Sequence, residues 1–177
     1  MALKVVIAPD PVLRTVCPAT DPKDPRIKRL AREMGKTMYR NNGVGLAAPQ
    51  VGETLRMFVI DVDQDDEGHR NLQVVVNPVI EWQSEETVTQ SEGCLSIPGC
   101  SFQVTRPASV TMRCTDENGH EVVYEKATGL LAECLQHEYD HLEGKTIFEV
   151  LDPIARIDAL QTYKEALERG AKPGDIE

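Results

Sequence analysis

The residues best suited to catalysis are His137, Glu138 and His141, which form the pattern H-E-x-x-H over residues 137–141. Side chains four residues apart on a helix lie on the same face, so two imidazoles there can bind one metal ion. The carboxylate beside the first histidine can reach water at that metal, which is the arrangement of a hydrolytic metal site. A pattern this short also arises by chance, and the alternative is a pair of hydrogen-bonded core histidines.

The sequence around this motif predicts a buried helix that follows Thr128 and Gly129 and ends before Gly144. Two buried imidazoles that bind nothing are costly, because each needs a hydrogen-bond partner. A catalytic metal usually has three protein ligands and an open position, so a third ligand is expected elsewhere in the chain. The inward stripe of the helix is expected to carry Leu130, Cys134, His137 and His141.

Cys94, in the segment Glu92-Gly93-Cys94-Leu95-Ser96, is the best candidate for the third ligand. A thiolate with two imidazoles suits zinc or ferrous iron and leaves a fourth position for water. The alternative is a small buried cysteine in a turn. A third motif, Gly43-Val44-Gly45-Leu46-Ala47-Ala48-Pro49-Gln50, predicts a tight turn that positions the Gln50 amide, and it does not match a nucleotide-binding loop.

Composition bounds the class of protein. The chain has 177 residues, 41% hydrophobic and 27% charged, which predicts a single soluble globular domain over 1–177. It shows neither a membrane-spanning apolar run nor a signal peptide, so a cytoplasmic location without membrane contact is expected. The net charge of −10 argues against non-specific nucleic-acid binding, and no nucleic-acid specificity is expected. The five scattered cysteines predict reduced thiols rather than disulfides.

Hydrophobic periodicity predicts an α+β fold, with helices on either side of a run of strands. Mainly antiparallel strands are expected to surround a central metal-binding H-E-x-x-H helix, with further helices near the N-terminus and the C-terminus. The segment 9–25 is expected to be irregular, and residues 169–177 are expected to be a frayed tail. The predicted N-terminal helix starts near Pro25 and breaks at 41–43, and the other predicted elements are strands at 56–63, 72–80, 85–91, 101–105, 108–115 and 120–126 and a helix at 153–168.

Taken together, the segments GVGLAAPQ (43–50), EGCLS (92–96) and QHEYDHLEG (136–144) resemble the peptide deformylases of bacteria in order and spacing. The segment 10–14 is also similar to the N-terminal region of that family, and the resemblance extends to about residue 165. It implies that Cys94, His137 and His141 are metal ligands, that Glu138 is the catalytic acid and base, and that Gln50 and the Leu95 N–H stabilise an oxyanion. The residues implied to line the substrate groove are Val44, Gly45, Glu92, Gly93 and Leu130.

The resemblance also implies an activity, a cofactor and partners. The family removes the N-formyl group from the formyl-methionine of nascent chains and releases formate. Its metal is usually Fe²⁺ in the cell, with Zn²⁺, Ni²⁺ or Co²⁺ able to replace it. The implied partner is a formyl-methionyl peptide or nascent chain, with transient ribosome association a further possibility. Two alternatives fit the motif itself: a metal-dependent endopeptidase, and a zinc-stabilised binding module with a closed fourth position.

Two positions depart from the family pattern. Ser101 stands where many bacterial relatives have an arginine shortly after the cysteine motif, so a cationic clamp on the peptide is not expected here. Glu133 stands where some relatives have an apolar side chain by the methionine pocket. Because Glu133 precedes His137 by one helical turn, we expect it near the groove. It would then either be a solvated charge without effect or give a mild preference for peptides carrying Lys or Arg.

Overall fold

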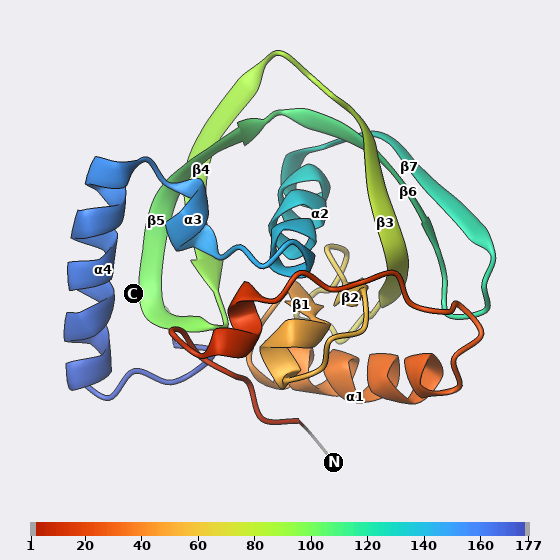
Figure 1. Ribbon diagram of the computed structural model, residues 1–177, viewed down its shortest axis with the longest axis horizontal. Helices are drawn as coiled ribbons and strands as arrows, with labels where there is room; N and C mark the ends of the chain where they lie inside the picture. The colour runs from red at the N-terminus through yellow and green to blue at the C-terminus, as the bar shows by residue number, and fades with distance from the viewer. Residues whose placement is uncertain (1–2, 176–177) are drawn as a thin grey trace.

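The computed structural model of the protein describes residues 3–175 and is a mixture of helices and antiparallel strands, as the sequence predicts (Figure 1). The elements in chain order are η1 (Pro11–Arg14), α1 (Arg26–Arg40), β1 (Gly45–Ala47), η2 (Ala48–Val51), β2 (Met57–Ile60), β3 (Gln73–Gln83), β4 (Thr87–Cys94), β5 (Ile97–Pro107), β6 (Ser109–Thr115), β7 (Glu121–Thr128), α2 (Gly129–Leu142), α3 (Ile147–Val150) and α4 (Pro153–Glu168).

The strands form two sheets, and every pair of neighbours is antiparallel. One sheet has the order β1-β2-β3-β6-β7, and β4 pairs with β5 in a separate two-stranded sheet. Helix α2 lies between the two sheets in Figure 1, with α1 below the larger sheet and α4 outside β5. Because α2 packs against β1, β2, β6 and β7, its side chains face the middle of the molecule.

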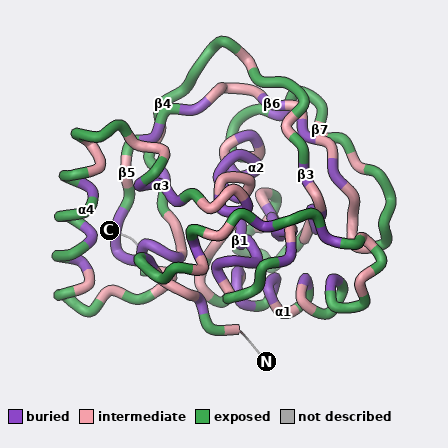
Figure 2. Tube along the Cα trace, viewed as in Figure 1, coloured by how far each residue is buried: buried purple, intermediate pink, exposed green. Residues whose placement is uncertain are grey.

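Helix α2 carries the H-E-x-x-H motif and is buried over most of its length (Figure 2). Ala132, Leu135 and Leu142 join a core formed with Phe58 and Met112 of the larger sheet. Burial of each such side chain stabilises the fold by about 1.5–3 kcal/mol. Helix packing, rather than local propensity, therefore fixes which face of α2 points inward.

The expectation that Leu130 belongs to the inward stripe of α2 is wrong. Leu130 is 45% exposed, whereas Cys134 and His141 on the same face are buried. Leu130 lies in the first turn of α2, which follows directly on β7, the last strand of its sheet. Helical spacing places a residue on a face, but only the surrounding elements decide whether that part of the face is covered.

Strand β3 continues through Pro78, although proline has no N–H to donate to a neighbouring strand. Asn77 has φ 50° and the register of β3 against β6 shifts between Val76 and Val79, so the proline lies in a bulge. The Asn77 side chain also forms two hydrogen bonds with the backbone of Thr20. Its Oδ1 accepts the Thr20 N–H at 2.8 Å, and its Nδ2 donates to the Thr20 carbonyl at 2.7 Å. The bulge thus fastens the N-terminal segment to the sheet.

A buried carboxylate fixes the end of β2 beside the glycine-rich turn. Asp61 accepts hydrogen bonds from the Tyr39 hydroxyl of α1 at 2.6 Å and from the backbone N–H of Asn71 at 2.7 Å. Burial raises the pKa of Asp61, but these hydrogen bonds outweigh burial and hold it below its usual range. The backbone N–H of Asp61 also donates to the Val44 carbonyl at 2.9 Å, so this residue connects the end of β2 to the entry to β1.

The expectation of a frayed tail is wrong for residues 169–175. The Gly99 N–H of β5 donates to the Asp175 carbonyl at 3.2 Å, and the Lys172 N–H donates to the Asp175 side chain at 2.7 Å. The C-terminal segment therefore folds back onto β5, while residues 176–177 lie outside the described range.

Neither α4 nor any other helix within 3–175 is long and apolar enough to cross a membrane.

Candidate metal centre and catalytic pocket

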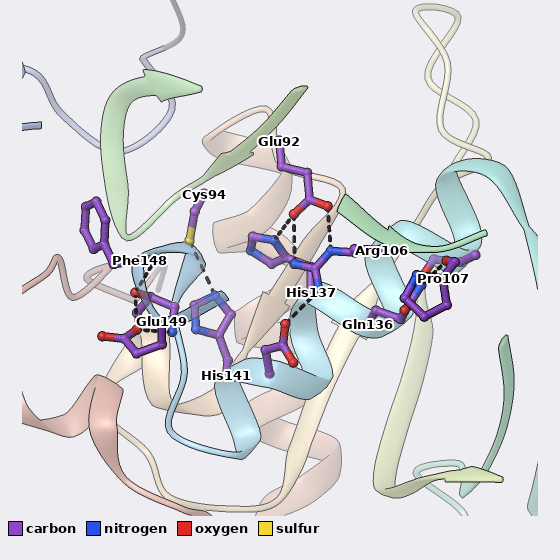
Figure 3. A network of polar contacts seen from close by, with 12 residues as sticks. Glu92, Cys94, Arg106, Pro107, Gln136, His137, His141, Phe148 and Glu149 are labelled. Atoms are coloured by element: carbon purple, nitrogen blue, oxygen red, sulfur yellow. Dashed lines mark hydrogen bonds and ion pairs between the residues drawn. The ribbon is translucent and has the colours of Figure 1, made fainter. Parts of the chain in front are cut away.

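Three potential metal ligands from two separate elements meet in the interior. Cys94 ends β4, where the register against β5 shifts between Gly93 and Cys94, and the two histidines come from α2. One ligand atom from each of Cys94, His137 and His141 lies within 4.8 Å of the other two, and Cys94 Sγ is 3.4 Å from His141 Nε2 (Figure 3). The three residues that the sequence singles out as ligands are thus brought together.

Glu92 orients the first histidine. Its Oε2 lies 3.1 Å from His137 Nδ1, and a proton donated through Nδ1 leaves Nε2 free to bind a metal. Burial disfavours the charged imidazole, but hydrogen bonds to Cys94 and Glu92 raise the pKa of His137 above its usual value. Glu92 itself is 1% exposed and faces His137 and Arg106. The carboxylate therefore belongs to the layer behind the ligands.

Arg106 of β5 completes this layer, and the sequence reasoning missed it. Its Nε donates to Glu92 Oε1 at 2.6 Å, and a second nitrogen donates to Glu92 Oε2 at 2.9 Å. A third nitrogen donates to Asp140 Oδ2 of α2 at 2.8 Å. Figure 3 shows the Arg106 guanidinium beside the Glu92 carboxylate, which also faces His137. Because the arginine is twelve residues from the cysteine motif and outside any motif, only the pairing of β4 with β5 brings it here.

Glu138 faces the centre from α2 and is almost fully buried. Burial raises its pKa to about 7, against the opposing effects of His137 and Arg106. Its Oε2 is buried and forms no hydrogen bond within residues 3–175. Gly45 leaves the necessary space, because a Cβ at that position would lie 2.9 Å from Glu138 Cδ. The glycine thus admits the carboxylate, which can gain or lose a proton near neutral pH.

Gln50 of η2 is held in one orientation. Its Oε1 accepts the Ala47 N–H at 2.8 Å, so its amide nitrogen points away from that contact, toward Ser96 Oγ at 3.1 Å and Cys94 Sγ at 3.5 Å. Ser96 donates its own proton to the Val6 carbonyl at 2.7 Å, which leaves the serine oxygen free to accept. Ser96 stands inside the cysteine motif, but its positioning role depends on Val6, which is 90 residues distant.

A pocket of about 210 Å³ opens beside two of the three ligands, Cys94 and His137. Of the residues expected to line a substrate groove, Val44, Gly45 and Gly93 border this pocket, and so do Gln50 and Leu95. Glu92 and Leu130 are not among its lining residues, so their place in a substrate groove stays a prediction. Glu92 is turned inward by Arg106, and Leu130 lies near the surface in the first turn of α2. Gly174 and Asp175 of the C-terminal segment also line the pocket, which the sequence did not indicate.

The donor set fits a divalent metal of intermediate softness. One thiol and two imidazoles converge beside Glu138, whose buried Oε2 has no hydrogen-bond partner among residues 3–175. Three protein ligands next to an open pocket are typical of a catalytic metal site rather than a closed structural one. Fold and site together define the class of a metal-dependent hydrolase with an H-E-x-x-H helix.

Comparison with known proteins identifies the family within that class. Residues 2–156 match the sequence model of the family described as polypeptide deformylase, and the chain belongs to this family. It is 43% identical over 169 residues to the peptide deformylase of Rhizobium meliloti, covering 95% of this chain and 96% of that protein. The chain is therefore an enzyme of the family that removes N-formyl groups from nascent peptides.

Solved structures agree with this assignment. The peptide deformylase of Thermus thermophilus superposes with a TM-score of 0.85 at 37% identity, over 96% of this chain and 97% of that chain. The Legionella pneumophila enzyme gives a TM-score of 0.84 at 37% identity, over 96% and 98%. A peptide deformylase from Ehrlichia chaffeensis, solved in complex with actinonin, gives 0.83 at 37% identity, over 93% and 96%. Family membership displaces the endopeptidase and binding-module alternatives.

Proposed function

We propose that this deformylase binds one divalent metal ion through Cys94, His137 and His141 and uses Glu138 as its acid and base. The convergence of the three ligand atoms on the buried carboxylate supports this assignment most strongly. Fe²⁺ is the proposed metal in the cell, and Zn²⁺, Ni²⁺ or Co²⁺ suits the same donor set. The whole chain is proposed to act as one catalytic domain in the cytoplasm, where nascent chains emerge.

The substrate is proposed to be the extended N-terminus of a formyl-methionyl peptide. Within residues 3–175, β1 pairs only with β2 and β4 pairs only with β5, so each has an edge with unpaired backbone groups. Both edges border the pocket, through Gly45 on β1 and Gly93 on β4. An extended peptide can add to such edges through main-chain hydrogen bonds, which bind it with little regard to sequence.

The chemistry is divided among the side chains around the pocket. A bound metal would polarise the formyl oxygen and make water more acidic. Glu138 accepts the proton of the attacking water and passes it to the leaving amine, a task that suits a carboxyl with a pKa of about 7. The Gln50 amide and the Leu95 N–H bind the formyl oxygen as it becomes negative, and each such donor is worth roughly 2.7–4 kcal/mol in comparable sites. Formate and a free amine result.

Replacement of the carboxylate tests this assignment. Glu138→Ala should retain the metal and the fold but lose turnover by a factor of about 10²–10⁴, because general acid–base catalysis contributes that much. Formate release from formyl-Met-Ala-Ser measures turnover, and elemental analysis measures metal content. A metal-loaded Glu138→Ala variant with wild-type turnover would refute the role.

Two binding partners follow from the same proposal. Actinonin, which is bound in the Ehrlichia relative, should bind the pocket here and raise the melting temperature of the metal-loaded protein. Ribosome association remains a prediction, and a chain of net charge −10 would have to contact ribosomal protein or basic segments rather than exposed RNA. Cosedimentation with ribosomes at low and high salt tests it.

A further inference from the structure

One wall of the catalytic pocket carries a polar pair. Glu133 of α2 lines the pocket together with Cys134, His137 and Glu138, and it is half-buried. The amide nitrogen of Gln90, on β4, donates a hydrogen bond to Glu133 Oε2. This contact joins the two elements that supply the metal ligands. Glu133 is therefore a fixed part of the pocket wall and not a freely solvated charge.

The free oxygen of this carboxylate has no compensating partner. Within residues 3–175, no hydrogen bond reaches Glu133 Oε1, and no lysine or arginine lines the pocket. Arg106, the nearest strong cation of the centre, is already engaged by Glu92 and Asp140. Asp175 adds a second acidic residue to the pocket lining. The pocket lining thus includes two carboxyl groups close to the reacting centre, and burial raises the pKa of the one on Glu133 above its usual value.

The position of Glu133 determines which part of a substrate it meets. It precedes His137 by one helical turn, so the two residues are about 5–6 Å apart along α2. The formylated nitrogen must lie beside Glu138, and the first side chain of the peptide branches from the next atom. In a pocket of about 210 Å³, that side chain and the Glu133 carboxylate share one space.

We propose that Glu133 and Gln90 form a specificity determinant that favours a hydrogen-bond-donating, above all cationic, first side chain on the formylated substrate. The proposal rests on the proposed function. An apolar side chain packed against Glu133 removes water from a carboxylate oxygen without replacing its hydrogen bond. A side chain that ends in an ammonium group replaces that hydrogen bond and pairs with the charge. The accepted substrates therefore include N-formyl peptides that begin with a residue other than methionine.

The test compares two substrates that differ only in the terminal group. Formyl-norleucine-Ala-Ser and formyl-lysine-Ala-Ser have the same first four side-chain carbons, and lysine adds an ammonium group. We expect kcat/KM for the lysine peptide, divided by kcat/KM for the norleucine peptide, to fall about 10-fold in Glu133→Leu. A hydrogen bond to a charged group typically contributes at least about 1.4 kcal/mol, which corresponds to a factor of ten. In Glu133→Gln, which keeps the shape of the side chain, the same ratio should fall by a smaller factor. The wild-type ratio should also shrink at high salt.

Glu125→Gln is the matched control, because Glu125 is an exposed glutamate on β7 away from the pocket lining. It should leave the substrate ratio unchanged. If both Glu133 variants keep the wild-type ratio, the specificity role is refuted even though the enzyme is active. If the metal-loaded wild type releases formate from none of the formyl-lysine, formyl-norleucine and formyl-methionine peptides, the proposed function itself fails. Should Glu133→Leu not fold, the isosteric Glu133→Gln carries the decision.

Discussion

Gly45→Ala should impair catalysis by displacing one carboxylate, without touching any metal ligand. A Cβ at position 45 would lie 2.9 Å from Glu138 Cδ, closer than real Cβ atoms come to another heavy atom. Glu138 is buried and packed on a rigid helix, so the carboxylate has to rotate away from the pocket. The backbone of Gly45 is part of β1 and has no positive φ, so alanine itself fits the strand.

The size of the effect follows from the role of Glu138. If the displaced carboxylate no longer reaches the attacking water or the leaving amine, kcat should fall by about 10²–10⁴, which equals roughly 3–5 kcal/mol. Metal content, measured by elemental analysis, should stay at the wild-type value because the ligands are unchanged. Steady-state formate release from a formyl-methionyl peptide measures the loss.

A double-mutant cycle separates displacement of Glu138 from obstruction of the substrate. In a Glu138→Ala background the added methyl group no longer meets a carboxylate, so Gly45→Ala should have little further effect on kcat. Strong non-additivity is therefore the expected result. If Gly45→Ala lowers kcat by the same factor in both backgrounds, the methyl group acts on the substrate or on β1, and the reasoning from the glycine–carboxylate contact is refuted.

Three further predictions address the metal, acid stability and the C-terminal segment. Cys94→Ala should lose bound metal and activity, whereas Cys114→Ala, a change at a buried cysteine, should keep both. Elemental analysis measures the metal content of the two variants, and equal contents would contradict the ligand role of Cys94. Asp61→Asn should lower the free energy of unfolding at pH 7 by about 1.5–3 kcal/mol. The pKa of Asp61 is depressed in the folded protein, so its contribution to stability is present above about pH 4 and is lost as the pH falls through the folded value. The free energy of unfolding, measured with urea at pH 7 and pH 3, should therefore depend less on pH in the variant than in the wild type. Gly99 has φ 74°, and a Cβ there would lie 2.7 Å from a methyl carbon of the C-terminal segment. Through this backbone strain and this contact, Gly99→Ala should displace the segment from the pocket and raise KM with kcat unchanged. An unaltered KM would show that the segment does not contact substrate.

The sequence predicted those parts of the site that local spacing encodes. The two histidines and Glu138 follow from helical periodicity, since one helix fixes their relation within a single element. Cys94 required a further argument, the need for a third ligand, and the resemblance to the family supplied its role. Arg106 could not be found in this way. It reaches the site only because β5 folds back on β4, a pairing between residues that local periodicity does not record.

The fold was predictable in type but less so in extent. Alternating apolar residues indicated antiparallel strands, and the order of helices and strands agrees with the structure. The three-residue β1 (Gly45–Ala47) was taken for part of a turn, because its glycine and small apolar residues carry no strand signal. Residues 169–177 were expected to be a frayed tail because chain ends are usually poorly ordered, but residues up to 175 are held by the backbone contact with Gly99. In both cases a tertiary contact outweighs weak local preference.

The ion pairs behind the metal ligands explain how the two-stranded sheet and helix α2 maintain one centre. Arg106 comes from β5 and binds Glu92 on β4 and Asp140 on α2, so one side chain joins the hairpin that carries Cys94 to the helix that carries the histidines. Loss of one partner from such a buried group typically costs about 3–5 kcal/mol, because the remaining charges stay buried and uncompensated. A hydrophobic replacement of equal volume could match this stability, but it could not orient His137 through Glu92. The position of the ligands, more than the stability of the fold, therefore accounts for a buried arginine at this site.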